Sequence, residues 1–244
     1  RVPLTLEDFD EVSARTPLLL DLKPSGTGYM EDFDQAGGLP TLMKELESTL
    51  DLEHVGVSGR SLGELLSEVR PAQSWQGTIH TLAEPLGGTG ALAVLTGSLA
   101  PDGAVIKTSA ATERLLQHTG PAVVFEDAGD AAMRIDDPEL EVTADSVLVL
   151  RNSGPVGAGM PEAGSLPIPR KISALGVTDM VRVSDARMSG TSYGTVVLHC
   201  APESAVGGPL ALVRDGDLIR LDVAGRRIDL LVEPEILEER RRDV

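Results

Sequence analysis

Cysteine and aromatic residues are scarce in this chain. Its 244 residues include a single cysteine, Cys200, and aromatic side chains make up 2%. One cysteine excludes an internal disulfide and a self-contained iron–sulfur or cysteine-rich zinc site. The core must therefore be built from Leu, Val, Ile and Ala, and we expect Cys200 to be a small buried member of it, because it lies in an apolar, strand-like run.

Long apolar runs and an excess of basic side chains are also missing. No run approaches the roughly 18 apolar residues of a membrane span, and no signal peptide is evident, so we expect a cytoplasmic protein without a membrane partner. The 38 acidic side chains outnumber the 21 basic ones, which gives a net charge of −17. This charge repels phosphate backbones and argues against nucleic acid as a partner. An anionic substrate would need a local cation or metal.

The first part of the sequence, residues 1–76, is predicted to be mainly helical. Thr5 is placed to cap a helix that runs to about Ser13. Apolar residues recur at helical spacing over 39–50. Ser61 and Glu64 have the spacing of a capping box at the start of a third helix.

From residue 77 onward the pattern changes to short β-rich runs separated by Gly, Pro and Asp. We expect strands at 92–95, 104–107, 122–125, 146–150, 180–183, 195–198, 210–213, 218–223 and 227–232, and helices at 110–118, 127–133 and 235–242. The helix expected at 235–242 carries many charged side chains, so we expect it to lie on the surface in contact with solvent. This mixture predicts an α/β fold in which residues 77–244 form one barrel-like domain.

Two polar loops are candidates for chemistry. The loop 184–192 lies between two apolar runs and contains the hydroxyls of Ser189 and Thr191 next to glycine; an ordinary polar hairpin is the alternative interpretation. The loop Gly154–Glu162 ends on a carboxylate that suits a hard cation such as Mg²⁺, although an exposed acid is the alternative. Lys107 is interpreted as a surface lysine. The four histidines have no metal-ligand spacing, and a Ser-His-Asp hydrolase is not supported.

Several long motifs resemble one enzyme family. The stretch ARMSGTSYG at 186–194, the stretch APESAVGGPLALVRDGDLI at 201–219 and the loop Gly154–Glu162 are similar to the C-terminal part of the dihydroxy-acid and sugar-acid dehydratases. The residues of the motif at 186–194 are most similar to those of the branch that acts on arabinonate and xylonate. The resemblance implies a swivelling β/β/α barrel-like domain, preceded by the helical end of an N-terminal domain. It also implies a hydro-lyase that converts an aldonic acid to a 2-keto-3-deoxy acid.

The resemblance also implies roles for individual residues. Ser189 matches the base that removes the proton next to the carboxylate, Thr191 matches a hydroxyl that contacts substrate, and Glu162 matches a magnesium ligand. The complete enzyme is expected to use Mg²⁺ and an iron–sulfur cluster and to be a homo-oligomer. The cluster ligands are expected in an N-terminal domain missing from this chain, so the chain alone should be inactive. Alternatives are a dihydroxy-acid dehydratase of branched-chain amino-acid synthesis and a non-catalytic binding or assembly module.

Overall fold

The chain divides into two compact units. The computed structural model describes residues 3–159, 166–187 and 193–242. One unit comprises Arg1–Ser13 and Leu92–Val244 and is called the barrel unit below; the other comprises Ala14–Ala91 and is called the helical unit. The predicted domain boundary after residue 76 is not tested by this division and stays a prediction.

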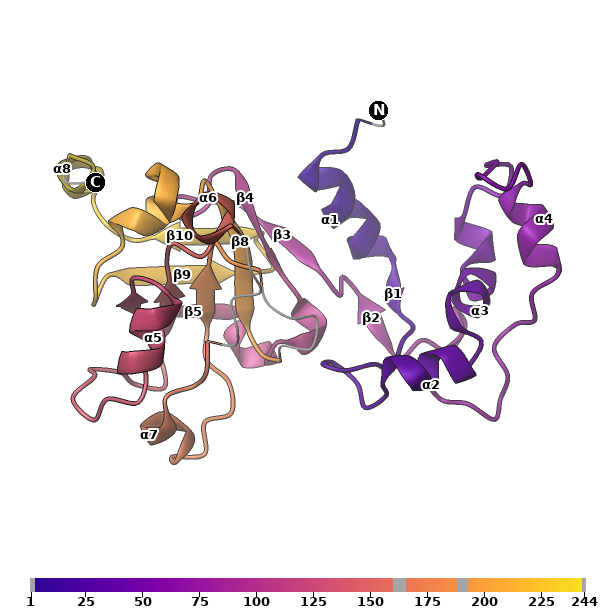
Figure 1. Cartoon of the computed structure of the whole chain (residues 1–244), viewed down its shortest axis with the longest axis horizontal. Coiled ribbons are helices and arrows are strands. Elements are labelled where there is room, and N and C mark those ends of the chain that lie inside the picture. The colour runs from indigo at the N-terminus through magenta and orange to yellow at the C-terminus, as the bar shows by residue number, and fades with distance from the viewer. Residues whose placement is uncertain (1–2, 160–165, 188–192, 243–244) are drawn as a thin grey trace. The chain divides into compact units, whose positions relative to one another are not determined.

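The helical unit is built from short helices and one small pair of strands (Figure 1). Its elements are β1 (Pro17–Leu18), α2 (Met30–Gln35), α3 (Gly38–Glu45), the 3-10 helix η1 (Glu47–Thr49), α4 (Leu62–Ser67) and β2 (Gly87–Thr89), which pairs antiparallel with β1. The predicted capping box is confirmed: the Ser61 N–H donates to Glu64 Oε2 at 2.7 Å, and the Glu64 N–H donates to Ser61 Oγ at 3.2 Å. These bonds satisfy two N–H groups that the start of α4 would otherwise leave unpaired.

The described part of the barrel unit contains an eight-stranded sheet that nearly closes on itself. Its strands are β3 (Ala93–Leu95), β4 (Gly103–Ile106), β5 (Gln117–Phe125), β6 (Val147–Leu150), β7 (Arg182–Ser184), β8 (Val196–Ala201), β9 (Leu218–Asp222) and β10 (Arg227–Leu230), in the order β10-β9-β5-β6-β7-β8-β4-β3. A bridge between Thr96 and Arg227 joins the two outer strands. The predicted barrel-like α/β fold after an N-terminal helical segment is therefore confirmed.

The barrel unit also contains helices and 3-10 turns. They are α1 (Leu6–Arg15), whose last two residues are assigned to the helical unit, η2 (Thr108–Ala110), η3 (Glu113–Leu115), α5 (Ala128–Arg134), α6 (Pro155–Ala158), α7 (Arg170–Ser173), η4 (Ser204–Val206), η5 (Pro209–Leu212) and α8 (Pro234–Arg240). In the described ranges, no helix combines the length and the apolar character needed to cross a membrane.

Both faces of the central parallel strands are buried, which explains their continuous apolar sequences. In β6, Val147 and Val149 belong to the core inside the barrel, whereas Leu148 and Leu150 belong to a second core that includes Ala131 of α5 and Ile172 of α7. Successive side chains of a strand point to opposite faces, so an unbroken apolar run is what a strand covered on both sides requires.

Two predicted elements are wrong. Residues 210–212 belong to the 3-10 turn η5 instead of a strand, and Pro209 occupies its first position, where a missing N–H costs no helical hydrogen bond and the restricted φ favours a helical turn. Residues 110–118 do not form a helix; two 3-10 turns lead into β5. The Thr112 N–H donates to the side chains of Asp179 and Thr195, both at 3.2 Å, and these long-range contacts hold the segment in its turns.

The terminal helix is confirmed in place, but it is not fully solvated. Leu237 of α8 packs against the core inside the barrel, and Arg240 forms an ion pair with Asp217. The predicted helix near 127–133 is confirmed as α5, with the Asp127 carboxylate accepting the Asp130 N–H at 2.8 Å.

The buried position of Cys200 leads to a test of the fold. Its side chain is 2% exposed, and burial, with a smaller contribution from the Asp185 charge, raises the pKa of the thiol above its ordinary range. We expect the folded chain to resist a thiol-specific reagent at pH 8, and the chain unfolded in guanidinium chloride to release one thiol equivalent. A Cys200→Ala variant supplies the blank. Full reaction of the folded chain at the rate of the unfolded one would contradict the buried position.

Candidate functional site

The three residues predicted to carry chemistry, Glu162, Ser189 and Thr191, lie outside the described residues. The structure does describe the segments that lead to them and away from them. Strands β6 and β7 are parallel neighbours, and Leu150 at the end of β6 pairs with Ser184 at the end of β7. The chain therefore starts toward Glu162 and toward Ser189 from the same edge of the sheet, where α/β folds tend to gather functional loops.

The hairpin interpretation of the loop 184–192 is wrong. Strands β7 and β8 pair in parallel, with Arg182 opposite Val196 and Val183 opposite Val197. A tight hairpin joins antiparallel strands, whereas a parallel pair needs a connection that crosses from one edge of the sheet to the other. The chain between β7 and β8 therefore does not form a tight hairpin.

Asp185 joins the segments that follow three strands. Its carboxylate is 1% exposed and accepts the Ser153 N–H at 3.0 Å, after β6, and the Ser204 N–H at 2.9 Å, after β8. The Ser204 hydroxyl donates to the same carboxylate at 2.6 Å. A buried carboxylate is stable when such donors surround it, and here the donors come from two other connections.

A second carboxylate holds the beginning of the Gly154–Glu162 segment. Glu203 accepts the N–H groups of Val156 at 2.9 Å and Gly157 at 3.0 Å, in the first turn of α6. Helix N–H groups in a first turn have no partner within the helix, so a carboxylate satisfies them well. A Cβ at Gly154 would lie 2.5 Å from Glu203 Oε2, which explains the glycine at this position.

One buried arginine contacts the chain just beyond both undescribed segments. Arg182 donates from Nη1 to the Leu166 carbonyl at 3.2 Å and from Nη2 to the Tyr193 carbonyl at 2.7 Å. Its side chain is 7% exposed and forms an ion pair with Asp179 at 3.2 Å. Two connections that leave the sheet at one edge thus return to a single guanidinium group.

Asp179 is the acceptor at the centre of this cluster. It accepts the Thr195 N–H at 3.0 Å and the Thr195 hydroxyl at 2.7 Å, in addition to the Thr112 N–H. Burial alone would raise the pKa of Asp179, but these hydrogen bonds and the Arg182 charge outweigh burial and hold the pKa below its ordinary value. Burial lowers the pKa of Arg182 against the opposing effect of Asp179.

The described residues do not provide a metal or cluster site. They contain no group of three or more His, Cys, Asp or Glu side chains arranged to hold a metal ion. Asp185 and Glu203 already bind backbone N–H groups. Cys200 lies in the core inside the barrel and does not fit an iron–sulfur cluster, which takes several accessible thiolates. Lys107 is exposed, as predicted, and partial burial lowers its pKa.

Sequence reasoning missed the four charged residues that organise these connections. Arg182 interrupts a buried apolar run, and such a charge requires a partner nearby, which was an available signal. The roles of Asp185 and Glu203 depend on residues 32 and 47 positions away, so no local pattern indicates them.

Comparisons with known proteins agree with the sequence motifs. A family model described as "Dihydroxy-acid/6-phosphogluconate dehydratase C-terminal" matches residues 77–244, and its N-terminal counterpart matches residues 1–65. The chain is 52% identical to 6-deoxy-6-sulfo-D-gluconate dehydratase of Pseudomonas putida over 98% of this chain and 42% of that protein. It is 47% identical to L-arabonate dehydratase of Azospirillum brasilense, over 100% of this chain and 42% of the relative. Dihydroxy-acid dehydratase of Methanothrix thermoacetophila is 41% identical, over 98% and 44%.

The Asp179 cluster leads to a pH-dependent prediction. An Asp179→Asn substitution removes the buried charge that pairs with Arg182, so the free energy of unfolding should fall by about 3–5 kcal/mol at pH 7. Folding lowers the pKa of Asp179 below its ordinary value of 3.8, so the stabilisation is present above that pH and is lost as pH falls through the folded pKa. Urea unfolding at several pH values should show the difference between wild type and variant narrowing below about pH 4.

Asp136→Asn is the matched control, because Asp136 pairs with the exposed Arg170. Its cost should be at most about 1 kcal/mol, as for other surface pairs. An Asp179→Asn cost no larger than that of the control, or one that does not change between pH 3 and pH 7, would contradict the assignment.

Proposed function

Because the chain belongs to the dihydroxy-acid/6-phosphogluconate dehydratase family, we propose that it is the C-terminal portion of a hydro-lyase that dehydrates a sugar acid. The chain spans about two fifths of the length of the curated relatives it matches, 42% for the Pseudomonas putida protein. The proposal therefore concerns the complete protein, to which this chain contributes one part of the active site.

The identities support a sugar acid as the substrate class. Relatives named for arabinonate or sulfogluconate are 45–52% identical to this chain, whereas the Methanothrix dihydroxy-acid dehydratase is 41% identical. A dihydroxy acid is the second candidate substrate, supported by the similarity to the Methanothrix dihydroxy-acid dehydratase. A substrate panel of arabinonate, xylonate, 6-deoxy-6-sulfogluconate and a branched dihydroxy acid separates the two. Turnover of none of them by the complete protein would favour a non-catalytic module.

In the proposed reaction an aldonic acid loses the proton on C2 and the hydroxyl on C3. The C3 oxygen leaves with a proton as water, and the resulting enol tautomerises to a 2-keto-3-deoxy acid. Ser189 would accept the C2 proton, and Thr191 would hold a substrate oxygen. A serine hydroxyl is a weak base, so it requires a positive field to act as an alkoxide. Glu162 would hold Mg²⁺, which when bound supplies that field and binds the substrate oxygens.

The observation that carries this proposal is the parallel pairing of β6 with β7. Because of this pairing, the segment that leads to Glu162 and the segment that leads to Ser189 both begin at the same edge of the sheet. Asp185 links the first residues of both segments, and Arg182 contacts the chain after both. These contacts support a shared site, because two loops attached to the same buried charges at each end are constrained together.

The proposed roles predict different kinetic effects for the two residues in the complete enzyme. Ser189→Ala should lower kcat by about 10²–10⁴-fold with KM nearly unchanged, because it removes a base that acts in the transition state. Glu162→Gln should weaken the binding of Mg²⁺ and of substrate together. Ser67→Ala and Glu235→Gln, at exposed positions, are the matched controls. Near-normal turnover of the Ser189→Ala enzyme would remove Ser189 from the mechanism.

The isolated chain should bind no iron–sulfur cluster. Such a cluster takes three or four protein ligands, and the one cysteine here is buried. Anaerobic reconstitution followed by iron and sulfide analysis should leave less than about 0.1 cluster per chain, well below the one cluster that a full set of ligands holds. Stoichiometric cluster on the 244-residue chain would refute the division of the site between two parts of a longer protein.

A further inference from the structure

A second feature of the barrel unit is a small hollow with three arginines in its lining. It lies where β5 and β6 end, next to the paired residues Phe125 and Leu150. Its volume is about 340 Å³, within the range of small-ligand sites. The lining residues are Val124, Glu126, Arg134, Arg151, Ala211, Val213, Arg214 and Asp215. Three of the chain's 21 basic side chains therefore line one hollow of a protein whose net charge is −17.

Arg151 is held by the sheet. It directly follows β6, its N–H donates to the Phe125 carbonyl at 3.0 Å, and its side chain is 11% exposed. Its Nη1 donates to Glu126 Oε1 at 2.8 Å. A charged side chain that is largely buried and already oriented loses little conformational freedom when it binds a further group.

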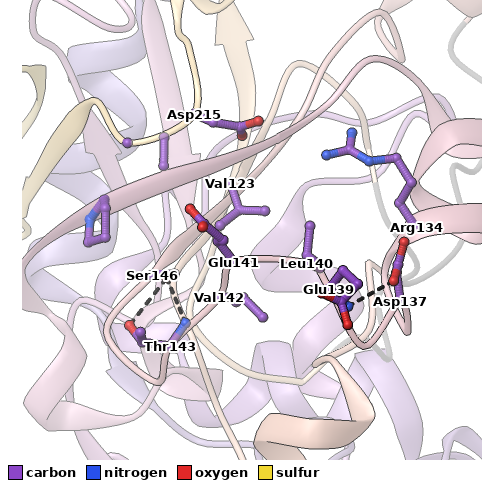
Figure 2. A pocket seen from close by; sticks show the side chains of 13 residues that line it. Val123, Arg134, Asp137, Glu139, Leu140, Glu141, Val142, Thr143, Ser146 and Asp215 are labelled. Atoms are coloured by element: carbon purple, nitrogen blue, oxygen red, sulfur yellow. Dashed lines mark hydrogen bonds between the residues drawn. The ribbon is translucent and has the colours of Figure 1, made fainter.

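Arg134 is held from α5. Its Nη1 donates to the Val124 carbonyl at 3.1 Å and to Asp130 at 2.8 Å, and its guanidinium group lies over the Phe125 ring. Arg134 and Asp215 also line a neighbouring hollow of about 710 Å³. Figure 2 shows both side chains among those that line the larger hollow, together with its apolar side chains Val123, Leu140 and Val142.

Two carboxylates in the lining oppose the arginines to different degrees. Asp215 is tied to the backbone, because its Oδ1 accepts the Val124 N–H at 2.6 Å. Glu126 has a side chain that is 62% exposed, and its contact with Arg151 is a single ion pair. Because the Glu126 carboxylate is mostly in water, an incoming anion can displace it from Arg151 without burying it elsewhere.

We propose that this arginine-lined hollow binds a small oxyanion: a phosphate, sulfonate or carboxylate group, either as a free inorganic ion or as part of an organic acid. Planar guanidinium groups donate forked hydrogen bonds that match such oxygens. The volume admits a group of this size with a short carbon chain. The proposal rests on the described residues of this hollow and does not depend on the roles proposed for Glu162 and Ser189.

The test measures anion binding to the 244-residue chain in low-salt buffer without divalent metal. Inorganic phosphate and arabinonate are titrated separately by NMR, and the amide shifts of residues 124–126, 151 and 214–215 are followed. Saturable shifts at these residues, with those of Arg227–Leu230 unchanged, are expected. Saturation by phosphate alone identifies a free inorganic ion as sufficient, whereas saturation by arabinonate alone identifies an organic acid.

Two substitutions with opposite expected effects separate binding from general damage to the fold. Arg214→Gln should weaken binding about tenfold, the effect of losing one charge-assisted hydrogen bond of about 1.4 kcal/mol. Glu126→Gln should tighten it about threefold, because a competing negative charge is removed, and destabilisation would not produce this gain. Arg170→Gln, which changes an arginine with an 89% exposed side chain on α7, should have no effect. Absence of saturable binding in both wild type and Glu126→Gln, or equal effects of Arg214→Gln and Arg170→Gln, would overturn the proposal.

Discussion

Arg182 carries a positive charge into the interior of the barrel unit, and the surrounding chain is arranged to satisfy it. Its guanidinium group binds the Asp179 carboxylate and the carbonyls of Leu166 and Tyr193. Removing either charge of a buried pair leaves the other without compensation, which is strongly destabilising. The pair is therefore a weak source of net stability but a strong constraint on where three separate segments of the chain can lie.

At the carboxyl ends of the same strands, the connecting segments are held by carboxylates that accept hydrogen bonds from backbone N–H groups. Asp185 binds the segments after β6 and β8, and Glu203 binds the first turn of α6. Connections in this region have little regular structure, so their N–H groups need side-chain acceptors. Parallel strands supply the common edge, and these two carboxylates determine how the connections leave it. These contacts support the proposal that the two connections contribute to one site.

The distribution of charge separates two regions of the barrel unit. The larger hollow near β5 carries Asp137, Glu139 and Glu141, consistent with an acidic chain, whereas the adjoining hollow gathers three arginines. The two hollows adjoin, because Arg134 and Asp215 line both of them. In a protein with a large net negative charge, a local cluster of guanidinium groups is the feature that allows a small anion to approach.

Local patterns in the sequence indicated the barrel-like α/β class, the capping box at Ser61, helix α5 and the burial of Cys200, because capping residues, short β-rich runs and apolar character can be recognised within short windows. Tertiary structure decided the rest. Residues 210–213 and 110–118 had apolar patterns compatible with other elements, and no short window indicates that β7 pairs with β8 in parallel. The sequence around Asp179, Arg182, Asp185 and Glu203 also does not indicate that these residues hold the connections between the strands. Most of their hydrogen bonds join residues more than ten positions apart, and the folded barrel alone brings those residues together.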